Sequence, residues 1–211
     1  MAAERGPQRG PTAGRCSVWN WRPVLKPDSP TGSDPVAVTL DWLDGWVIDL
    51  GLCPFAAPVR RSDLIRAVAC DEPELSAVLE CLQRELTHLT ATPRTELATT
   101  LIVLPTALAD FDDYCDFLAV VDDILEAMEL TGTIQVASFH PDYRFDGVAS
   151  EDASNYTNRS PFPILHLLRE LDVSEAVDGH SDPHGIPDTN VARLRALGIE
   201  EIRRRYAGRW S

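Results

Sequence analysis

A histidine and a cysteine of this chain have the side chains and the positions best suited to catalysis. His140 comes directly after the apolar run Ile134–Phe139, and an imidazole at such a position can act as a general base or as a metal ligand. The alternative is a turn histidine whose ring hydrogen-bonds the loop backbone. Cys53 precedes Pro54 in a predicted turn, where a thiol can be a nucleophile or a metal ligand. The alternative for Cys53 is a small, buried apolar side chain.

A group of polar residues after position 154 indicates a site for a small anion. Ser160 and Pro161 are typical of a helix start, and the free N–H groups and positive dipole end of a helix attract anions. The guanidinium of Arg159 adds a bidentate donor for a carboxylate or a phosphate. The alternative is an elaborate helix cap in which Arg159 pairs with a neighbouring acid. The residues expected to contact the anion are Asn155, Thr157, Asn158, Arg159, Ser160, His166 and Arg169.

The elements that must position these residues alternate between helices and strands. Asp34 and Pro35 predict a helix start, and Gly51 predicts its end. Asp71 and Glu74 have the spacing of a capping box for a second helix. Apolar and β-branched runs predict strands over 64–70, 99–104 and 134–139. Helices are predicted over 35–50, 72–90, 110–129, 161–169 and, with a break near position 198, 188–206; the segments 140–160 and 173–187 are predicted loops.

The alternation of strands and helices predicts an α/β fold, with a single small, mainly parallel sheet of three or four strands flanked by helices. In such sheets ligands bind outside the carboxyl ends of the strands, which is where His140 stands. The helix predicted over 161–169 would place His166 and Arg169, three residues apart, on one face. Residues 33–211 are predicted to form this one domain.

Residues 1–32 differ in composition from the rest of the chain. They contain five basic and two acidic residues and are rich in Pro, Gly and Ser. The composition predicts a disordered or loosely packed basic extension. A cytoplasmic location is expected for the protein, and organelle import by this extension is the alternative.

Charge and composition exclude several kinds of chemistry. The chain has 33 Asp and Glu residues against 19 Lys and Arg residues, for a net charge of −14. Such a surface repels the phosphate backbone of nucleic acids and anionic membranes, and no apolar run is long enough to span a membrane. Lys26 is the only lysine and lies in the N-terminal extension. The predicted domain therefore has no lysine for a Schiff base and no P-loop.

Five widely spaced cysteines do not form a disulfide framework or a zinc ribbon, and they favour a reducing cytoplasm. Two alternatives to an enzyme remain open. One is a haem- or metal-binding protein that uses Cys53, His140 or His166 as ligands. The segment 180–184 also has ligand-type side chains, but it matches no known metal-binding spacing. The other alternative is a non-catalytic protein that binds a basic partner through the acidic face of helix 110–129.

Several segments of the chain resemble a known family. They are the run 50–56 around Cys53, the run 135–141 around His140, and residues 155–161, which continue into the sequence His-Leu-Leu-Arg-Glu at 166–170. Together they resemble domain-of-unknown-function family 1415, an uncharacterised family, over roughly residues 36–200. The resemblance implies a soluble single-domain protein. It implies no particular activity and no catalytic residues.

The function expected from these residues is that of an enzyme acting on a small anionic molecule. In this hypothesis His140 moves protons, Cys53 is the nucleophile and Arg159 anchors the anion. The hypothesis requires these side chains to meet in one cavity. The sequence determines neither the substrate nor a cofactor nor the oligomeric state.

Overall fold

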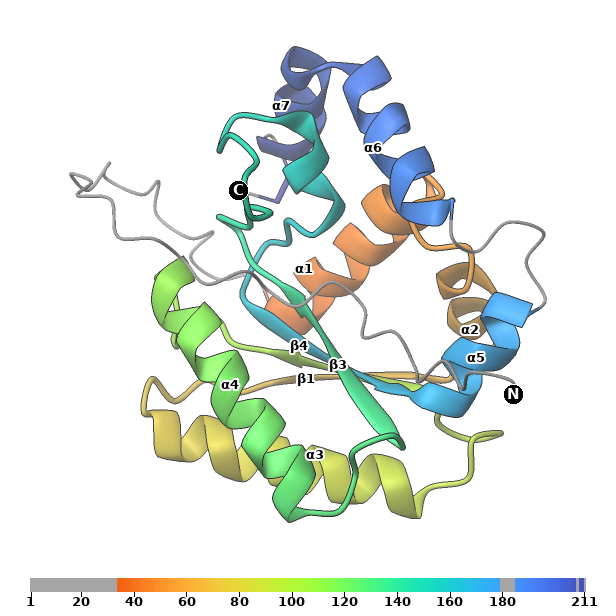
Figure 1. Ribbon diagram of the computed structural model, residues 1–211, viewed down its shortest axis with the longest axis vertical. Coiled ribbons are helices and arrows are strands. Elements are labelled where there is room, and N and C mark those ends of the chain that lie inside the picture. The colour runs from red at the N-terminus through yellow and green to blue at the C-terminus, as the bar shows by residue number, and fades with distance from the viewer. Residues whose placement is uncertain (1–33, 179–184, 208, 211) are drawn as a thin grey trace, which may run out of the picture.

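The computed structural model of the protein describes residues 34–178, 185–207 and 209–210. A four-stranded sheet lies in the middle of this part, with helices on both faces (Figure 1). The strands are β1 (Ile65–Ala69), β2 (Thr99–Val103), β3 (Ile134–Phe139) and β4 (Ile164–Arg169). Their order across the sheet is β1-β2-β4-β3. The predicted α/β class is confirmed, and so are the three predicted strands.

The prediction of a mainly parallel sheet is wrong. Within the described residues β1 and β2 form the one parallel pair, while β4 is antiparallel to both β2 and β3. The difference comes from β4, which was expected to be a helix. Its apolar run fits a short helix and a buried strand equally well. Because β4 lies between two other strands and packs apolar side chains on both faces, pairing with its neighbours decides its conformation.

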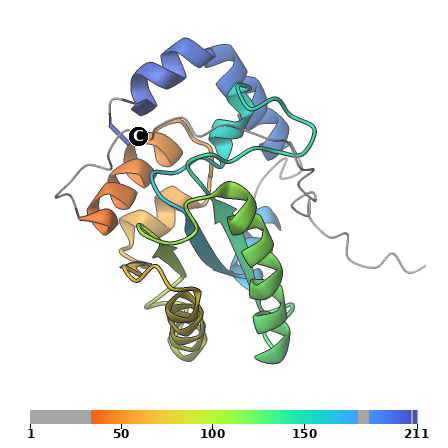
Figure 2. The same ribbon diagram turned by 90° about the vertical axis from the view of Figure 1, so that its left-hand side faces the viewer.

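Two long helices, α3 (Leu75–Ala91) and α4 (Phe111–Ala127), cover one face of the sheet. Figure 2 shows them side by side beneath the sheet. The core on this face includes Leu82, Leu86, Ile102, Tyr114, Leu165 and Leu167. The helix α3 begins three residues later than the predicted capping box requires, with Glu74 in the capping position and Asp71 outside it.

The opposite face is covered by α1 (Pro35–Trp42), its π-helical continuation η1 (Leu43–Ile48), α6 (Ile186–Leu197) and α7 (Ile199–Ala207), with α2 (Ala56–Arg61) and the 3-10 turn η2 (Ala153–Thr157) beside them. The predicted start of α1 is confirmed, because the carboxylate of Asp34 accepts the N–H of Val36 at 3.0 Å. Its predicted end is confirmed as well, since Gly51 has a backbone φ of +60°, the left-handed conformation that favours glycine.

The C-terminal part of the chain is more helical than the sequence suggests. The helix α5 (Glu170–Asp178) follows β4 directly, so the first residues of the predicted loop 173–187 are helical. The predicted break near residue 198 is confirmed, because Gly198 has a φ of +81° between α6 and α7. No helix of the described part is long and apolar enough to cross a membrane.

Candidate functional site

His140 lies just beyond the carboxyl end of β3, as the sequence predicts, but its side chain is fully buried. Nε2–H donates to the carbonyl oxygen of Leu108 at 3.1 Å, and Nδ1 accepts the N–H of Asp142 at 3.0 Å. The ring packs against Phe111 and Tyr114, with centroids 5.2 Å away in both cases. Both ring nitrogens therefore hydrogen-bond the loop backbone, as in the turn-histidine alternative. The lone pair of Nδ1, which a general base would need, already accepts the N–H of Asp142.

The polar side chains expected to bind an anion instead fold their own loop. Asn155 is fully buried; its Oδ1 accepts the N–H of Phe145, and its Nδ2 donates to the carbonyls of Ala149 and Ser150. Arg159 Nη2 donates to the carbonyl of Ser150 at 2.8 Å. These contacts hold the segment 143–150 against the residues that precede β4.

Arg159 makes two further contacts of the same kind. Its Nε donates to the carbonyl of Tyr143 at 3.3 Å, and its guanidinium carbon lies 4.4 Å from the centre of the Tyr156 ring. Asn158 Nδ2 donates to the carbonyl of Ser138 at 3.1 Å, and Ser160 Oγ donates to that of Phe162 at 2.5 Å. The Oγ1 atom of Thr157 is buried without a hydrogen-bond partner among the described residues.

No helix starts at Ser160, because the chain passes from there into β4. The helix N-terminus on which the predicted anion site depended is therefore absent from this part of the structure. That expectation is wrong for a physical reason: the backbone N–H of Ser160 donates across the loop to the carbonyl of His140 at 3.4 Å, and the chain then enters β4. A strand presents no dipole end to an anion.

Cys53 lies between η1 and α2, on the face of the sheet covered by α1. It is partly buried, and its sulfur accepts the N–H groups of Phe55 and Ala56. Burial nevertheless raises the pKa of the thiol. The ring of His140 packs instead with α4 residues on the opposite face. The structure does not bring the two into the nucleophile–base pair that the sequence hypothesis required.

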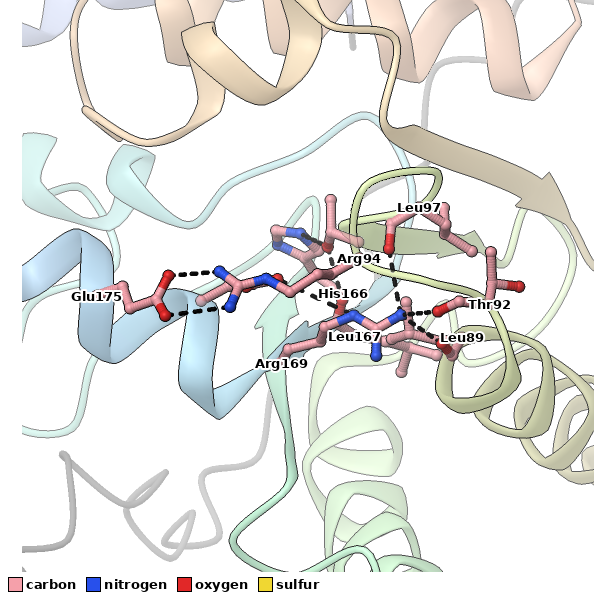
Figure 3. Close-up of polar contacts among 10 residues, drawn as sticks. Leu89, Thr92, Arg94, Leu97, His166, Leu167, Arg169 and Glu175 are labelled. Atoms are coloured by element: carbon pink, nitrogen blue, oxygen red, sulfur yellow. Dashed lines mark hydrogen bonds and ion pairs between the residues drawn. The ribbon is translucent and has the colours of Figure 1, made fainter.

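His166 differs from His140 in one respect that matters for chemistry. It lies in the centre of the sheet on β4, between Leu101 of β2 and Ala137 of β3. Its Nε2 lies 2.7 Å from the hydroxyl oxygen of Thr99, and that hydroxyl donates to the carbonyl of Leu167 at 2.6 Å (Figure 3). Because the hydroxyl proton is used in this way, Thr99 accepts the Nε2 proton of the ring, and Nδ1 carries the lone pair.

The Nδ1 atom of His166 has no hydrogen-bond partner among the described residues. The side chain is partly buried, and burial lowers the pKa of the ring to about 4. The imidazole is therefore neutral at physiological pH. A neutral ring that is anchored at one nitrogen and unpaired at the other can accept a proton from a bound molecule.

Helix α1 carries two other unpaired polar atoms, and its Trp42 is connected to this ring through Phe139. Phe139 contacts His166 with a centroid distance of 6.1 Å and contacts Trp42 of α1 with one of 5.5 Å. The indole N–H of Trp42 and the hydroxyl of Thr39, one turn earlier in α1, are completely buried, and neither has a hydrogen-bond partner among the described residues. Neither residue stands out in the sequence, because a buried tryptophan and threonine on an amphipathic helix normally belong to the core.

Arg169 points to the other face of the sheet from His166, because residues three apart on a strand alternate faces. The expectation that the two share a helix face is wrong. Arg169 Nη2 donates to the carbonyls of Leu89, Thr92 and Leu97 at 2.5, 2.7 and 3.2 Å and so closes the C-terminal end of α3 (Figure 3). Three engaged carbonyls indicate a structural role for this guanidinium.

Two hollows at the surface of the described part have volumes of about 500 and 320 Å³. Arg169 lines the smaller one together with Arg94 and Asp172, whose side chains form an ion pair of 2.6 Å. Neither hollow is lined by Cys53, His140, Arg159 or His166. The predicted convergence of these side chains does not occur in either hollow.

The metal-binding alternative and the acidic-surface alternative depend on carboxylate, histidine and cysteine side chains. No group of three or more His, Cys, Asp or Glu side chains within the described ranges could hold a metal ion. The segment 180–184, with its two histidines, lies outside the described residues. The acidic residues of α4 are exposed, while Phe111, Tyr114, Phe117, Val121 and Leu125 face the core, as expected for a solvated helix face.

Comparison with known proteins gives a family without an assigned activity. The family described as "Protein of unknown function (DUF1415)" matches residues 35–204. This range includes the whole sheet and the candidate residues from Cys53 to Arg169. No curated protein and no solved structure matches the chain. Since the match covers most of its length, the chain belongs to the DUF1415 family.

Proposed function

We propose that this protein is an enzyme that acts on a small polar molecule, with His166 as the residue that accepts a proton from it. The observation that carries the proposal is the asymmetry of the His166 ring. Its Nε2 is anchored to Thr99 at 2.7 Å, whereas its Nδ1 has no partner among the described residues. A general base needs a neutral ring, a fixed orientation and an unpaired nitrogen.

The hydroxyl of Thr99 supplies the orientation. It donates to the carbonyl of Leu167 in the backbone of β4, so its own position is determined by the sheet. The ring of His166 is thereby held in one tautomer, with the proton on Nε2. When Nδ1 accepts a proton from a substrate, the Nε2–H remains bonded to Thr99 and the ring keeps its position. The positive charge that develops on the ring is then stabilised by the oriented hydroxyl dipole of Thr99.

The unpaired donors of α1 support a ligand on the same face of the sheet. A buried donor without a partner costs about 1–3 kcal/mol, and such groups in a native structure call for an explanation. Trp42 Nε1–H and Thr39 Oγ1–H are two donors of this kind. A ligand with carbonyl, carboxylate or hydroxyl oxygens would satisfy them while its acidic proton faces Nδ1 of His166.

In this proposal the roles predicted for other residues from the sequence change. His140 and Arg159 hold the loop 140–160 rather than move protons or bind an anion, because their polar atoms bond to backbone. The expectation of an anionic substrate depended on a helix start at Ser160. The proposal therefore specifies hydrogen-bond acceptors on the ligand and assigns it no net charge.

The state of the ring can be tested directly by NMR on protein labelled with ¹⁵N-histidine. We expect Nδ1 of His166 to be unprotonated at pH 7 and the ring to titrate with a midpoint near pH 4. In Thr99→Val the ring loses its anchor, and its two tautomers should become mixed. A His166 ring that is protonated at Nδ1 at pH 7 would overturn the proposal.

Accessibility of the lone pair can be tested with diethyl pyrocarbonate, which modifies unpaired imidazole nitrogens. Mass spectrometry of the treated native protein should show modification of His166 and of the exposed His88, but not of the fully buried His140. Protection of His166 while His88 reacts completely would contradict the assignment.

Turnover is tested by screening p-nitrophenyl esters of short carboxylic acids and amides of the same acids against the wild type and His166→Gln in parallel. Loss of a general base lowers a rate by about 10²–10⁴-fold, so we expect any hydrolysis by the wild type to fall to that extent in the variant. The matched control is His88→Gln, which should retain the wild-type rate. Equal rates in the wild type and His166→Gln would rule out His166 as the base.

A further inference from the structure

Two thiols face each other on the side of the sheet covered by α3, away from His166. Cys70 follows β1 directly and is 4% exposed, and Cys81 lies in the second turn of α3 and is 2% exposed. Both belong to the core cluster on this face. The side chains of Cys70 and Cys81 interact with each other through a hydrogen bond, so the two thiols are neighbours in this core.

The sulfur of Cys70 is the better placed nucleophile of the two. It accepts the backbone N–H of Glu72 in addition to the Cys81 thiol, and donors directed at sulfur stabilise a thiolate. Its own backbone N–H bonds to the carbonyl of Val103 at 2.8 Å, in continuation of the β1–β2 pairing. The Cys70 sulfur is therefore held at a defined point at the end of β1.

The sulfur of Cys81 is in contact with the guanidinium of Arg84. Arg84 Nη2 lies 3.1 Å from it, and the Arg84 side chain is 63% exposed. This guanidinium also contacts Glu85, a buried carboxylate that pairs with Arg66 of β1 at 2.8 Å. A guanidinium next to a sulfur stabilises negative charge there.

Burial opposes ionisation of the two thiols in the reduced protein. It raises the pKa of both thiols, that of Cys81 to about 11. Both are therefore protonated at neutral pH, and the dithiol is the resting form. Only a small fraction of these thiols is ionised, so oxidation is slow. A long-lived oxidant such as a hydroperoxide is therefore a better reagent for them than a short-lived one.

We propose that Cys70 and Cys81 form a redox-active dithiol that a hydroperoxide converts to an intramolecular disulfide. The Cys70 thiolate attacks the outer oxygen of the peroxide, the O–O bond breaks, and an alcohol or water leaves, which gives a sulfenic acid on Cys70. The sulfur of Cys81 then attacks the Cys70 sulfur, and water leaves. In sum, two thiols and one hydroperoxide give one disulfide, one alcohol and one water, with the peroxide reduced and the two sulfurs oxidised.

The product would link the end of β1 to α3. Neighbouring thiols on two packed elements can be joined by a disulfide when their Cα atoms lie about 4.4–6.8 Å apart. Formation of the bond removes the sulfur acceptor of Arg84, whose remaining described partner is Glu85. A thiol reductant restores the dithiol, so the modification is reversible.

Peptide mapping of the full-length protein tests this proposal, because trypsin cuts after Arg66 and Arg84 and releases residues 67–84 as one peptide that contains both cysteines. The reduced protein is treated with hydrogen peroxide, alkylated with iodoacetamide and digested without reductant. We expect the peptide to be lighter by two hydrogen atoms and to carry no alkyl group. Treatment with dithiothreitol before alkylation should restore two alkyl groups. Two alkylated cysteines after peroxide, or oxidation to sulfonic acids without a disulfide, would overturn the proposal.

Single variants identify which sulfur reacts first. In Cys81→Ser the reaction should stop at a sulfenic acid on Cys70, which dimedone traps as an adduct on peptide 67–84. In Cys70→Ser the loss of the Cys81 thiol under the same peroxide should be slower by roughly tenfold, because Cys81 lacks the backbone donor that Cys70 has. Cys115→Ser, on α4, is the matched control and should give the same disulfide yield as the wild type. Because the first readout uses the wild-type protein, it holds even if one serine variant does not fold.

Discussion

His140 and Leu108 form the hydrogen bond that joins the end of β3 to the start of α4. Nε2–H of His140 donates to the carbonyl oxygen of Leu108 at 3.1 Å, and Leu108 has a backbone φ of +54°. A left-handed conformation costs a non-glycine residue about 1–2 kcal/mol. The bond from a buried ring offsets part of this cost. It also positions Asp110, whose side chain caps α4 by accepting the N–H groups of Asp112 and Asp113.

His140→Ala should destabilise the protein strongly. The substitution removes the donor to Leu108 and the acceptor for the N–H of Asp142, and it leaves a cavity between Phe111 and Tyr114. We expect the free energy of unfolding to fall by about 3 kcal/mol. Urea denaturation followed by circular dichroism measures this change. His140→Gln retains an amide that can replace one of the two bonds, so its loss should be smaller; a wild-type midpoint for His140→Ala would contradict the structural role.

Arg169→Met should destabilise the end of α3. The variant keeps much of the apolar volume but leaves the carbonyls of Leu89, Thr92 and Leu97 without the Nη2 donor. We expect a loss of about 2 kcal/mol in the free energy of unfolding, together with faster amide hydrogen exchange in the last turn of α3.

Arg204→Met is the matched control for Arg169→Met. Arg204 forms an exposed ion pair with Glu201 within α7, and such solvent-screened pairs contribute little to stability. If both arginine variants show the same small loss, the carbonyl cluster around Arg169 is not what stabilises this end of α3.

The wild type should lose stability as the pH falls from 6.5 to 4 because of His166. Burial lowers the pKa of its ring from 6.5 to about 4, so in this range the unfolded chain binds a proton that the folded protein does not. Stability from this group is present above pH 6.5 and is lost as the pH falls through the folded pKa. At pH 4.5 we expect a contribution of about 2 kcal/mol to the loss.

The His166 contribution is isolated by comparing the wild type with His166→Gln, which cannot titrate. The difference in the free energy of unfolding between the two proteins should shift in favour of the variant by about 2 kcal/mol between pH 7 and pH 4.5. Other titrating groups affect both proteins alike and cancel in the difference. A difference that does not change with pH would show that the ring of His166 is not shifted by burial.

Arg159→Ala should loosen the loop 143–150 and leave the rest of the domain unchanged. Arg159 holds this loop through the carbonyls of Tyr143 and Ser150 and packs over the ring of Tyr156. Hydrogen exchange should become at least about tenfold faster in the loop, equivalent to about 1.4 kcal/mol. Arg159→Lys cannot make both bonds in the same plane and should resemble the alanine variant. Unchanged exchange in the loop, combined with loss of phosphate binding that the wild type shows, would restore the anion-binding role.

Features that depend on only a few neighbouring residues, such as helix caps and strand positions, could be predicted from the sequence. The first helix starts at Pro35 after the Asp34 cap and ends before Gly51, as predicted, since capping groups and left-handed glycines act on the neighbouring turn of backbone. The three β-branched runs became β1, β2 and β3 within one or two residues of their predicted bounds. The absence of lysine after Lys26 limits the chemistry of the domain whatever its fold.

The conformation of Ile164–Arg169 could not be decided locally. Four apolar residues around one histidine satisfy the periodicity of a helix and that of a doubly buried strand. The choice was made by β2 and β3, whose backbone groups pair with this segment over its full length. That single difference turned a mainly parallel sheet into one with a single parallel pair, removed the helix start at Ser160, and separated His166 from Arg169 onto opposite faces.

The sequence by itself determined the family, the α/β class and the set of side chains available for chemistry. Only the tertiary structure decided which of those side chains keep an unpaired atom. Leu108 lies 32 residues from His140 and occupies one of its nitrogens, and Thr99 lies 67 residues from His166 and anchors only Nε2. Whether the nitrogen lone pair of a histidine is hydrogen-bonded depends on groups that folding brings from such sequence distances. The residues next to the histidine in the sequence therefore do not predict it.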